Sequence, residues 1–511
     1  MVRHVLALIR PIVVSLASLA ATSVDAQTVP TMRPAWSLNG SRDDQEAITG
    51  AWDNSIVSRP SEQIAEAPLR VAGRHFMDPM GRVVILRGVN LSGDAKVPPF
   101  QHHVGPSELE YLASLGMNVI RLLFLWEAYE PVPGCYDEAY LERLRLIARA
   151  AWSVGMHVII DIHQDGFSRY ASLGSGDGFP AWAVSPRGRL STPDNSPRSK
   201  YWPLMMAVDP TSYKSFADFF DDRHGVRTRY LMMLARLAER CASIPGVIGY
   251  DLLNEPWGDE RRDLAPLYED AARAIRSRHS AAILFLEGHI TTNGGRPSRL
   301  PRPTFDGASY APHYYKPSTL VLQRWQGNTL PIDHAFSRMA SHAATWDAPL
   351  FLGEFGAPAN ARHVGDYVSA IYDRLDACLA SGTQWNVTPG WDPCLKDGWN
   401  GEDFSMLSPD GSPRPNFRLR PYPRHTAGWP ARFAYRTAKT PWHARLLEYV
   451  WEHHPDRGNT EIFVPNRLFP PGSTISVQPP DLVYWRDEAR QLLICRLPRT
   501  TTARVLMVAP E

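Results

Sequence analysis

Two glutamates, Glu255 and Glu354, lie at the ends of apolar segments, where their carboxyl groups could take part in catalysis. Glu255 lies in DLLNEPWG, and Glu354 lies in PLFLGEFGAP, an apolar run in which flanking glycines permit close approach. Glycosidic bonds are cleaved by two carboxyl groups, one protonating the leaving oxygen and the other attacking or activating water. The pair therefore predicts glycoside hydrolysis. Asn254, beside Glu255, can hydrogen-bond a sugar hydroxyl.

Two further acids have a similar local pattern. Glu287 lies in LFLEG, and Asp251 lies in YDLLNEP. A buried carboxylate without a partner is unfavourable, so we expect both to pair with Arg or His inside the fold. Neither is predicted to act on substrate.

Other polar and aromatic side chains end neighbouring apolar runs. Each of them alone is as compatible with packing or ion pairing as with substrate contact, but together they predict a binding site. They are Arg121 in NVIRLLF, His163 and Asp165 in DIHQDGF, His313 and Tyr315 in APHYY, and Trp385 in GTQWN. Trp385 offers an aromatic face to the apolar side of a pyranose ring.

These residues end short β-branched and aromatic runs that alternate with amphipathic segments, the pattern of βα units. The runs begin at Val83, Asn118, His157, Val247, Ala282, Ala308, Pro349 and Gly382. Each begins apolar and ends polar or aromatic, as strands of a parallel barrel do where they open onto the active-site loops. A (β/α)8 TIM barrel is predicted. A doubly wound open sheet is the alternative, but the chain has no Gly-rich dinucleotide fingerprint.

The barrel is expected over residues 70–415, after an N-terminal extension at 27–69. Short strand-like segments in residues 416–511 predict a C-terminal antiparallel β-sandwich. Residues 166–210 form a long insertion rich in Gly, Pro and aromatic side chains, which we expect to wall or cover the barrel mouth.

The first 26 residues resemble a signal peptide: Arg3 and His4 precede a mostly apolar run that ends in Val24-Asp25-Ala26. Cleavage after Ala26 would start the mature chain at Gln27 and send it to the periplasm or outside the cell. An uncleaved anchor is the alternative. Later apolar stretches fall short of the ~20 residues that a spanning helix needs.

The amino-acid composition argues against some kinds of binding partner. Lys and Arg number 54 against 53 Asp and Glu, so no single-sign field favours nucleic acid or an anionic membrane. The 5 cysteines form no C-x-x-C pair, so a structural zinc site is not predicted. Cys378 and Cys394 flank one predicted strand, and whether they form a disulfide is left open. The oligomeric state is open as well.

The order of the site candidates along the predicted strands resembles that of glycoside hydrolase family 5. Five segments are similar to those of its endoglycoceramidase-related branch: AKVPPF, DIHQDGFSRY, DLLNEPW, GWNGEDFS and RPYPRHTAG. The resemblance implies that Glu255 is the acid/base and Glu354 the nucleophile of a retaining double displacement. It also implies sugar contacts, made by Lys96, Asp165, Asn254, Tyr315 and Trp385. It requires no metal or cofactor.

The expected reaction is hydrolysis of the β-bond between sugar and ceramide in a glycosphingolipid, with peripheral contact to lipid surfaces. Aromatic residues of the insertion, Phe167, Phe179, Trp182 and Trp202 among them, are expected to shelter the lipid. A family 5 β-glucosidase, steryl glucosidase, endo-β-glucanase or mannanase is the first alternative. A catalytically inactive carbohydrate- or lipid-binding barrel is the second, and the presence of both glutamates argues against it.

Overall fold

The computed structural model describes residues 69–199, 202–437 and 445–509. Its central element is an 8-stranded parallel sheet in the order β10-β11-β4-β5-β6-β7-β8-β9. A parallel bridge between Tyr310 and Leu350 joins the two end strands, so the sheet closes into a barrel. The strands are β4 (Arg87–Leu91), β5 (Val119–Leu125), β6 (His157–His163), β7 (Val247–Asp251), β8 (Ile283–Leu286), β9 (Ala308–Tyr310), β10 (Phe351–Leu352) and β11 (Ser381–Val387). The predicted TIM barrel is confirmed.

The barrel closes because its strands are apolar and, at two points, lack a side chain. A Cβ on Gly88 would lie 1.7 Å from the carbonyl oxygen of Val119, and one on Gly249 would lie 2.0 Å from that of Ile283. Only glycine permits these strands to approach each other so closely. At the amino end of the barrel, Phe76 packs against Phe285 and Phe351 and closes the interior.

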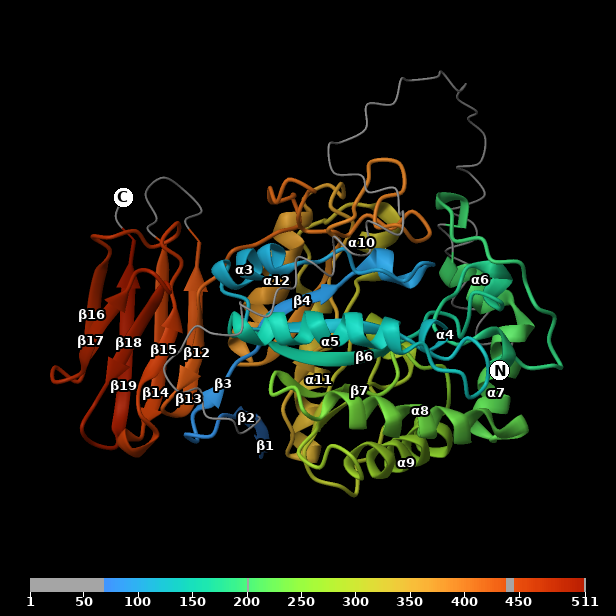
Figure 1. Ribbon diagram of the computed structural model, residues 1–511. Helices are drawn as coiled ribbons and strands as arrows, with labels where there is room; N and C mark the ends of the chain where they lie inside the picture. Colours follow the sequence, from blue (N-terminus) through green and yellow to red (C-terminus); the bar gives the residue numbers. More distant parts are fainter. Residues whose placement is uncertain (1–68, 200–201, 438–444, 510–511) are drawn as a thin grey trace, which may run out of the picture. The chain divides into compact units, whose positions relative to one another are not determined.

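Helices cover the outside of the barrel; α5 runs alongside β6, and α8 lies beside α9 (Figure 1). The outer helices are α3 (Pro106–Ser114), α5 (Glu138–Ser153), α8 (Val226–Cys241), α9 (Ala265–Arg276), α11 (Leu330–Trp346) and α12 (Val364–Ala377). Shorter helices lie in the connections that follow strand ends: α4 (Trp126–Tyr129), α6 (Trp202–Val208), α7 (Pro210–Phe220) and α10 (Pro317–Leu322).

Two antiparallel sheets form the C-terminal part, and the predicted β-sandwich is confirmed. One sheet has 4 strands in the order β13-β14-β19-β16, and the other has 7 in the order β1-β2-β3-β12-β15-β18-β17. A continuous apolar core, including Tyr449, Trp451, Leu493 and Val505, lies between them. The strands after the barrel are β12 (Tyr422–Thr426), β13 (Gly428–Arg436), β14 (Leu446–His453), β15 (Thr460–Phe463), β16 (Thr474–Gln478), β17 (Val483–Asp487), β18 (Leu492–Arg496) and β19 (Thr501–Val508).

Three strands that precede the barrel in sequence belong to the sandwich. They are β1 (Arg70–Ala72), β2 (His75–Met77) and β3 (Val83–Val84), and β3 pairs with β12 through Val84 and His425. The predicted run from Val83 therefore divides: its first two residues join the seven-stranded sheet, and Arg87–Leu91 enters the barrel. This pairing joins segments from opposite ends of the described chain, which local periodicity could not indicate.

The insertion at 166–210 corrects one prediction. Phe167 and Phe179 do not face a ligand: both are buried, and they stack on each other with ring centroids 4.2 Å apart. Phe219 and Tyr230 pack around them. These aromatic side chains form a core between the insertion and the helices α7 and α8, because a segment of this length needs buried apolar contacts to be ordered.

The disulfide left open does not form, since Cys378 and Cys394 are both free thiols. Cys378 ends α12 just before β11, whereas Cys394 follows the other end of that strand. A seven-residue strand spans about 23 Å. A disulfide requires Cα atoms within about 7 Å of each other.

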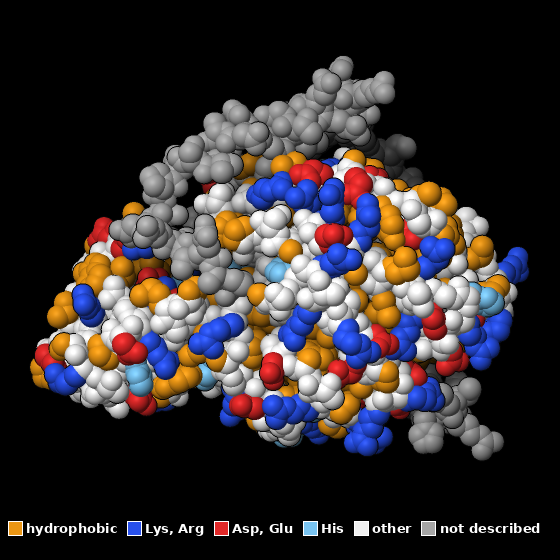
Figure 2. Space-filling model, turned by 60° about the horizontal axis from the view of Figure 1, so that its bottom comes forward, with side chains coloured by type: hydrophobic (Ala, Val, Ile, Leu, Met, Phe, Trp, Pro, Cys, Tyr) orange, Lys and Arg blue, Asp and Glu red, His pale blue; other side chains and the backbone are white. Residues whose placement is uncertain are grey.

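The signal peptide of residues 1–26, nearly all of the extension at 27–69, and Tyr201 lie outside the described residues. Among the described ones, no helix has both the length and the apolarity needed to cross a membrane. On the face drawn in Figure 2, Lys and Arg side chains are interspersed with Asp and Glu rather than gathered into one basic surface. This agrees with the balanced composition.

Candidate active site

Glu255 follows β7 at the carboxyl end of the barrel, where the residue is 9% exposed. Its Oε1 accepts hydrogen bonds from Asn293 Nδ2 at 2.7 Å and, with the ring nitrogen as donor, from His313 Nδ1 at 2.9 Å. Within the described part of the chain, no side chain hydrogen-bonds the other oxygen, Oε2. That oxygen is therefore available to carry a proton toward a substrate.

Glu354 follows β10 and is held by two donors. Arg121 Nη1 donates to its Oε1 at 2.7 Å, and the Tyr315 hydroxyl donates to its Oε2 at 2.8 Å. Both donors were predicted at the ends of other strands, β5 and β9. A carboxylate with one donor on each oxygen is fixed in orientation, as an attacking group needs to be.

The two carboxyl groups face each other across His313. Its Nδ1 lies 2.9 Å from Glu255 Oε1 and 3.5 Å from Glu354 Oε2, and an oxygen of each carboxyl lies within 4.8 Å of the other. Retaining glycosidases place their carboxyl groups about 5–5.5 Å apart, and inverting ones about 6.5–9.5 Å. An approach of the nearest oxygens to within 4.8 Å agrees with the shorter spacing of the retaining class.

Burial raises the pKa of Glu255, and the negative charges of Glu354 and Asp165 add to the increase; His313 opposes it. A raised pKa keeps this carboxyl protonated at higher pH than an ordinary glutamate, which an acid catalyst requires.

Arg121 is fully buried, and its charged group contacts acidic side chains from several neighbouring barrel strands. Its guanidinium donates to Asp251 at 3.0 Å and to Asp161 at 2.8 Å, and it lies 3.3 Å from Glu287. Asp251 and Glu287 are thus ion-paired inside the barrel, as predicted. Asn254 also belongs to this network, because its Oδ1 accepts a hydrogen bond from Arg121 at 2.9 Å.

A second group of predicted residues lies beside the carboxyl pair. Lys96 Nζ donates to Asp165 Oδ2 at 2.6 Å and lies 4.5 Å from the centre of the Trp385 ring. The Trp385 ring stacks on His163 at 5.5 Å with an interplanar angle of 7°. Lys96, Asp165, His163 and Trp385 are all nearly fully buried, so a sugar hydroxyl that reached them would meet fixed partners rather than water.

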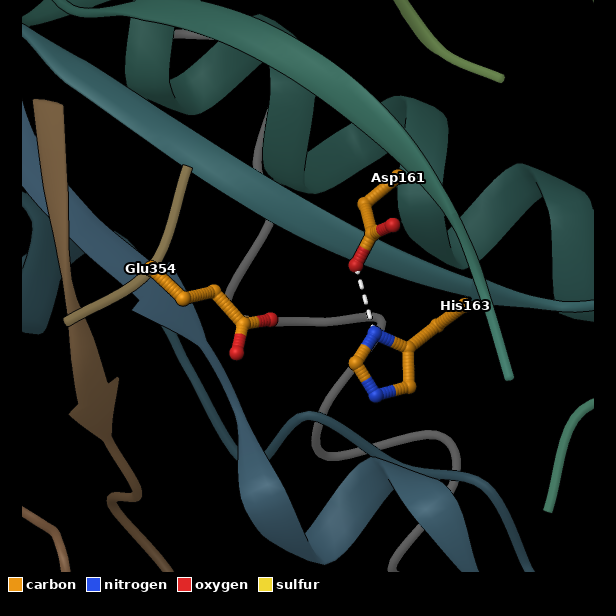
Figure 3. Close-up of side chains that lie close together, drawn as sticks. All are labelled: Asp161, His163 and Glu354. Atoms are coloured by element: carbon orange, nitrogen blue, oxygen red, sulfur yellow. Dashed lines mark hydrogen bonds and ion pairs between the residues drawn. The ribbon is translucent and has the colours of Figure 1, made fainter. Parts of the chain in front are cut away.

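Asp161 keeps His163 in place. Both residues come from β6, and His163 Nδ1 lies 2.7 Å from Asp161 Oδ2, with Glu354 beside them (Figure 3). Burial alone would lower the pKa of His163, but the charge of Asp161, together with hydrogen bonds to Asp161 and Asp165, raises it to about 10. The ring is therefore a cation at neutral pH.

Several site residues were not predicted from sequence. Asn293 reaches Glu255 from the connection after β8, and Trp399 places its ring 3.9 Å from Lys96 Nζ. Glu402 accepts hydrogen bonds from the indole nitrogens of Trp385 at 3.4 Å and Trp202 at 3.3 Å. Glu402 and Trp399 lie in GWNGEDFS, so that motif was the signal for these two; Asn293 had none.

Some triads of acidic and histidine side chains could hold a cation by spacing alone, among them His163–Asp165–Asp177. The ammonium group of Lys96 already lies 2.6 Å from Asp165 and 4.0 Å from Asp177. The lysine thus supplies the positive charge that a metal would bring to these carboxylates. Hydrolysis by two carboxyl groups needs no metal.

A parallel barrel with two carboxyl groups this close at its mouth defines the class of retaining glycoside hydrolases. Residues 81–390 match the model of the family described as cellulase (glycosyl hydrolase family 5), and residues 420–508 match the glycoside hydrolase family 5 C-terminal domain. The chain belongs to glycoside hydrolase family 5.

Three similar proteins narrow the comparison. Endoglycoceramidase I of Rhodococcus hoagii is 29% identical over 80% of this chain and 82% of its own. A glucosylceramidase of Rhizopus delemar is 28% identical over 37% of this chain and 35% of its own. The structure of endo-glycoceramidase II from Rhodococcus sp. in complex with ganglioside GM3 has a TM-score of 0.71 and 26% identity, covering 86% of this chain and 100% of that one.

Proposed function

We propose that this enzyme hydrolyses the β-glycosidic bond between the sugar and the ceramide of glycosphingolipids, with retention of configuration. The observation that carries the retaining mechanism is the closeness of the Glu255 and Glu354 carboxyl groups, within 4.8 Å. The substrate class rests on the similarity over most of the chain to proteins named endoglycoceramidases.

In the first step, Glu354 attacks the anomeric carbon, and Glu255 gives its proton to the glycosidic oxygen as the bond to ceramide breaks. Arg121 and Tyr315 orient the attacking carboxylate. In the second step, Glu255 takes a proton from water, which attacks the anomeric carbon and releases Glu354. Proton and bond balance are complete without a cofactor.

We assign the sugar to the side of the mouth that contains Lys96, Asp165 and Trp385, which offers hydrogen-bond partners and one aromatic face. The lipid portion then extends from the leaving oxygen beside Glu255. Trp257 lies two residues after Glu255 and is partly exposed, with Tyr213 and His289 in ring contact with it. We therefore assign the apolar surface beside the scissile bond to these three rings, and not to Phe167 and Phe179.

Contact with a lipid surface is part of the proposal. Several large apolar side chains are at least half exposed in the connections that follow barrel strands β6 and β9: Leu173, Leu190, Val208, Val321 and Leu322. We infer that these side chains contact the boundary between water and lipid, as apolar groups of membrane-surface proteins do. Export, by cleavage after Ala26, remains a proposal from the sequence, which N-terminal sequencing of the mature chain would test.

The deciding experiment is a substrate panel in detergent, containing glucosylceramide, lactosylceramide, a steryl glucoside, cellulose and mannan. We expect release of the intact sugar from a ceramide glycoside, with the β-anomer appearing first by NMR. Initial α-anomer would overturn retention. Activity on cellulose or mannan, without activity on any glycolipid, would overturn the lipid substrate and leave the carboxyl assignment intact.

A family 5 β-glucosidase or steryl glucosidase is the second candidate, since the same carboxyl pair serves either leaving group. Activity on the steryl glucoside alone would favour it. The other alternative, a catalytically inactive binding barrel, predicts no turnover of any aryl β-glycoside, so any such turnover would exclude it.

A further inference from the structure

Glu287 is a buried carboxyl group for which the two-step mechanism has no role. It follows β8 and is 1% exposed. Its Oε2 accepts a hydrogen bond from the backbone N–H of Glu255 at 3.0 Å, and its Oε1 lies 3.1 Å from His313 Nε2. Glu287 therefore contacts the acid/base residue through the backbone and, through His313, also reaches its side chain.

These contacts close a ring. The Glu255 carboxyl is 2.9 Å from His313 Nδ1, the opposite nitrogen of that imidazole is 3.1 Å from Glu287, and Glu287 returns to the Glu255 backbone. One ring nitrogen is hydrogen-bonded to Glu255, and the other faces Glu287 as an ion-pair partner, so both contacts favour this ring orientation. A change at Glu287 would be transmitted to Glu255 by two routes, whereas no other buried acid described here has both.

The backbone of Glu255 requires such support. Its φ is +42°, in the left-handed region that residues other than glycine rarely adopt. A conformation of this kind persists only where the surroundings hold it. Here the Glu255 N–H is held by Glu287, and its carbonyl accepts a hydrogen bond from Gln164 Nε2 at 3.2 Å.

We propose that Glu287 is a positioning residue for proton transfer: it holds His313 and the backbone of Glu255 so that the acid/base carboxyl faces the leaving oxygen. The inference rests on the proposed function, because it gives Glu255 the acid/base role. Glu287 itself touches neither substrate nor the reacting atoms.

The charges around His313 set the direction of the expected pH effect. Glu255, Glu287 and Glu354 face the ring from three connections, an oxygen of Asp251 lies within 4.8 Å of a ring nitrogen, and Arg121 contacts Glu287. Burial would lower the pKa of His313, but Glu287 and then Glu354 raise it well above its usual value. The resulting imidazolium in turn lowers the pKa of Glu255.

Burial raises the pKa of Glu287 to about 8, so this carboxyl is fully charged only above that pH. Removing its charge there reverses this sequence. The pKa of His313 falls, the ring becomes neutral, and the pKa of Glu255 rises further. Glu255 acts as an acid only while it is protonated. The high-pH limb of kcat/KM, where Glu255 loses its proton, therefore moves to higher pH, by about one unit.

Two variants and one control test the proposal. Glu287→Gln keeps an acceptor for the Glu255 N–H but removes the charge, whereas Glu287→Ala removes both. Asp251→Asn is the matched control: Asp251 is equally buried and also binds Arg121, but within the described part of the chain no hydrogen bond or ion pair joins it to His313 or Glu255. Circular dichroism checks that each variant is folded.

We expect Glu287→Gln to shift the high-pH limb. For an aryl glycoside with a poor leaving group, kcat should fall about tenfold with little change in KM. For an aryl glycoside with an activated leaving group, kcat should change little. Glu287→Ala should lower kcat about a hundredfold. Nitrogen-15 NMR at pH 9, where Glu287 is charged, should find both His313 ring nitrogens protonated in the native enzyme and only one in Glu287→Gln. Asp251→Asn removes a charge near His313 without removing a direct contact, so it should change the pH limb and the His313 spectrum clearly less than Glu287→Gln does.

A native pH limb and a native His313 spectrum in Glu287→Gln would overturn the positioning role. So would equal loss on activated and poor leaving groups, because that pattern indicates general damage to the site. Failure of the proposed function has a different signature: Glu354→Gly or Glu255→Ala would then hydrolyse aryl glycosides at the native rate, whatever Glu287 does.

Discussion

The barrel mouth and the C-terminal sandwich bury different kinds of side chain. At the mouth, the buried groups are charged: Arg121 is 0% exposed and contacts Asp161, Asp251, Glu287 and Glu354. Between the sheets of the sandwich, the core is apolar and aromatic, with Leu447, Tyr449 and Trp451 each 0% exposed.

Apolar and charged side chains contribute differently to the stability of the fold when they are buried. Apolar burial stabilises a fold by about 25 cal/mol per Å² removed from water. A buried ion pair returns little net stability, because desolvation offsets most of the attraction. We therefore expect that substitutions at the mouth chiefly reduce activity and that substitutions in the sandwich core chiefly reduce stability. Four predictions test that division, in order of decreasing effect.

Replacing Glu354 by Gly should give the largest effect. Loss of a nucleophile lowers kcat by about 10⁴- to 10⁶-fold, while the variant should remain folded by circular dichroism. Added azide can enter the vacated space and attack the anomeric carbon, so hydrolysis should be replaced by slow formation of an α-glycosyl azide. Absence of that product on an activated substrate would remove Glu354 from the nucleophile role.

Replacing Glu255 by Ala should have a smaller effect that depends on the leaving group. Substrates with poor leaving groups should lose about 10²- to 10⁴-fold in kcat, and activated ones much less. Because burial and nearby negative charges raise the pKa of Glu255, native kcat/KM falls at high pH as this acid loses its proton. The variant should lack that limb on activated substrates; a limb that stayed would belong to another group.

Replacing Trp451 by Ala should show the opposite behaviour. This fully buried side chain packs between the sheets, with its ring 4.9 Å from that of Tyr449. The truncation should lower the free energy of unfolding by about 3–5 kcal/mol in denaturant titration. kcat/KM of the folded fraction should not change, and a loss of activity without a loss of stability would contradict the division.

The smallest and sharpest test removes one hydroxyl group in each region. Tyr315→Phe deletes the donor to Glu354, and Tyr449→Phe deletes a hydroxyl 2.6 Å from that of Thr426. Tyr315→Phe should lower kcat/KM about tenfold with little change in the unfolding midpoint. Tyr449→Phe should lower stability by about 1 kcal/mol with native kinetics. The reverse pattern would show that the two regions share both tasks.

Much of the mouth followed from local sequence pattern. All eight predicted runs contain barrel strands, and Glu255 and Glu354 follow the fourth and seventh of them. Parallel strands buried on both faces must be apolar along their length and become polar where they open onto loops. That change of polarity is written in consecutive residues, so a sequence is enough to detect it.

The sequence by itself thus determined the barrel, the two carboxyl groups and the apolar strands of the sandwich, because each depends on short-range pattern. The tertiary structure alone decided that Asn293 reaches Glu255, that Phe167 and Phe179 pack together, and that β3 pairs with β12. It also placed Glu287 behind both Glu255 and His313. These contacts join side chains far apart in the chain, and which partners meet is set by barrel closure and packing rather than by the spacing of residues.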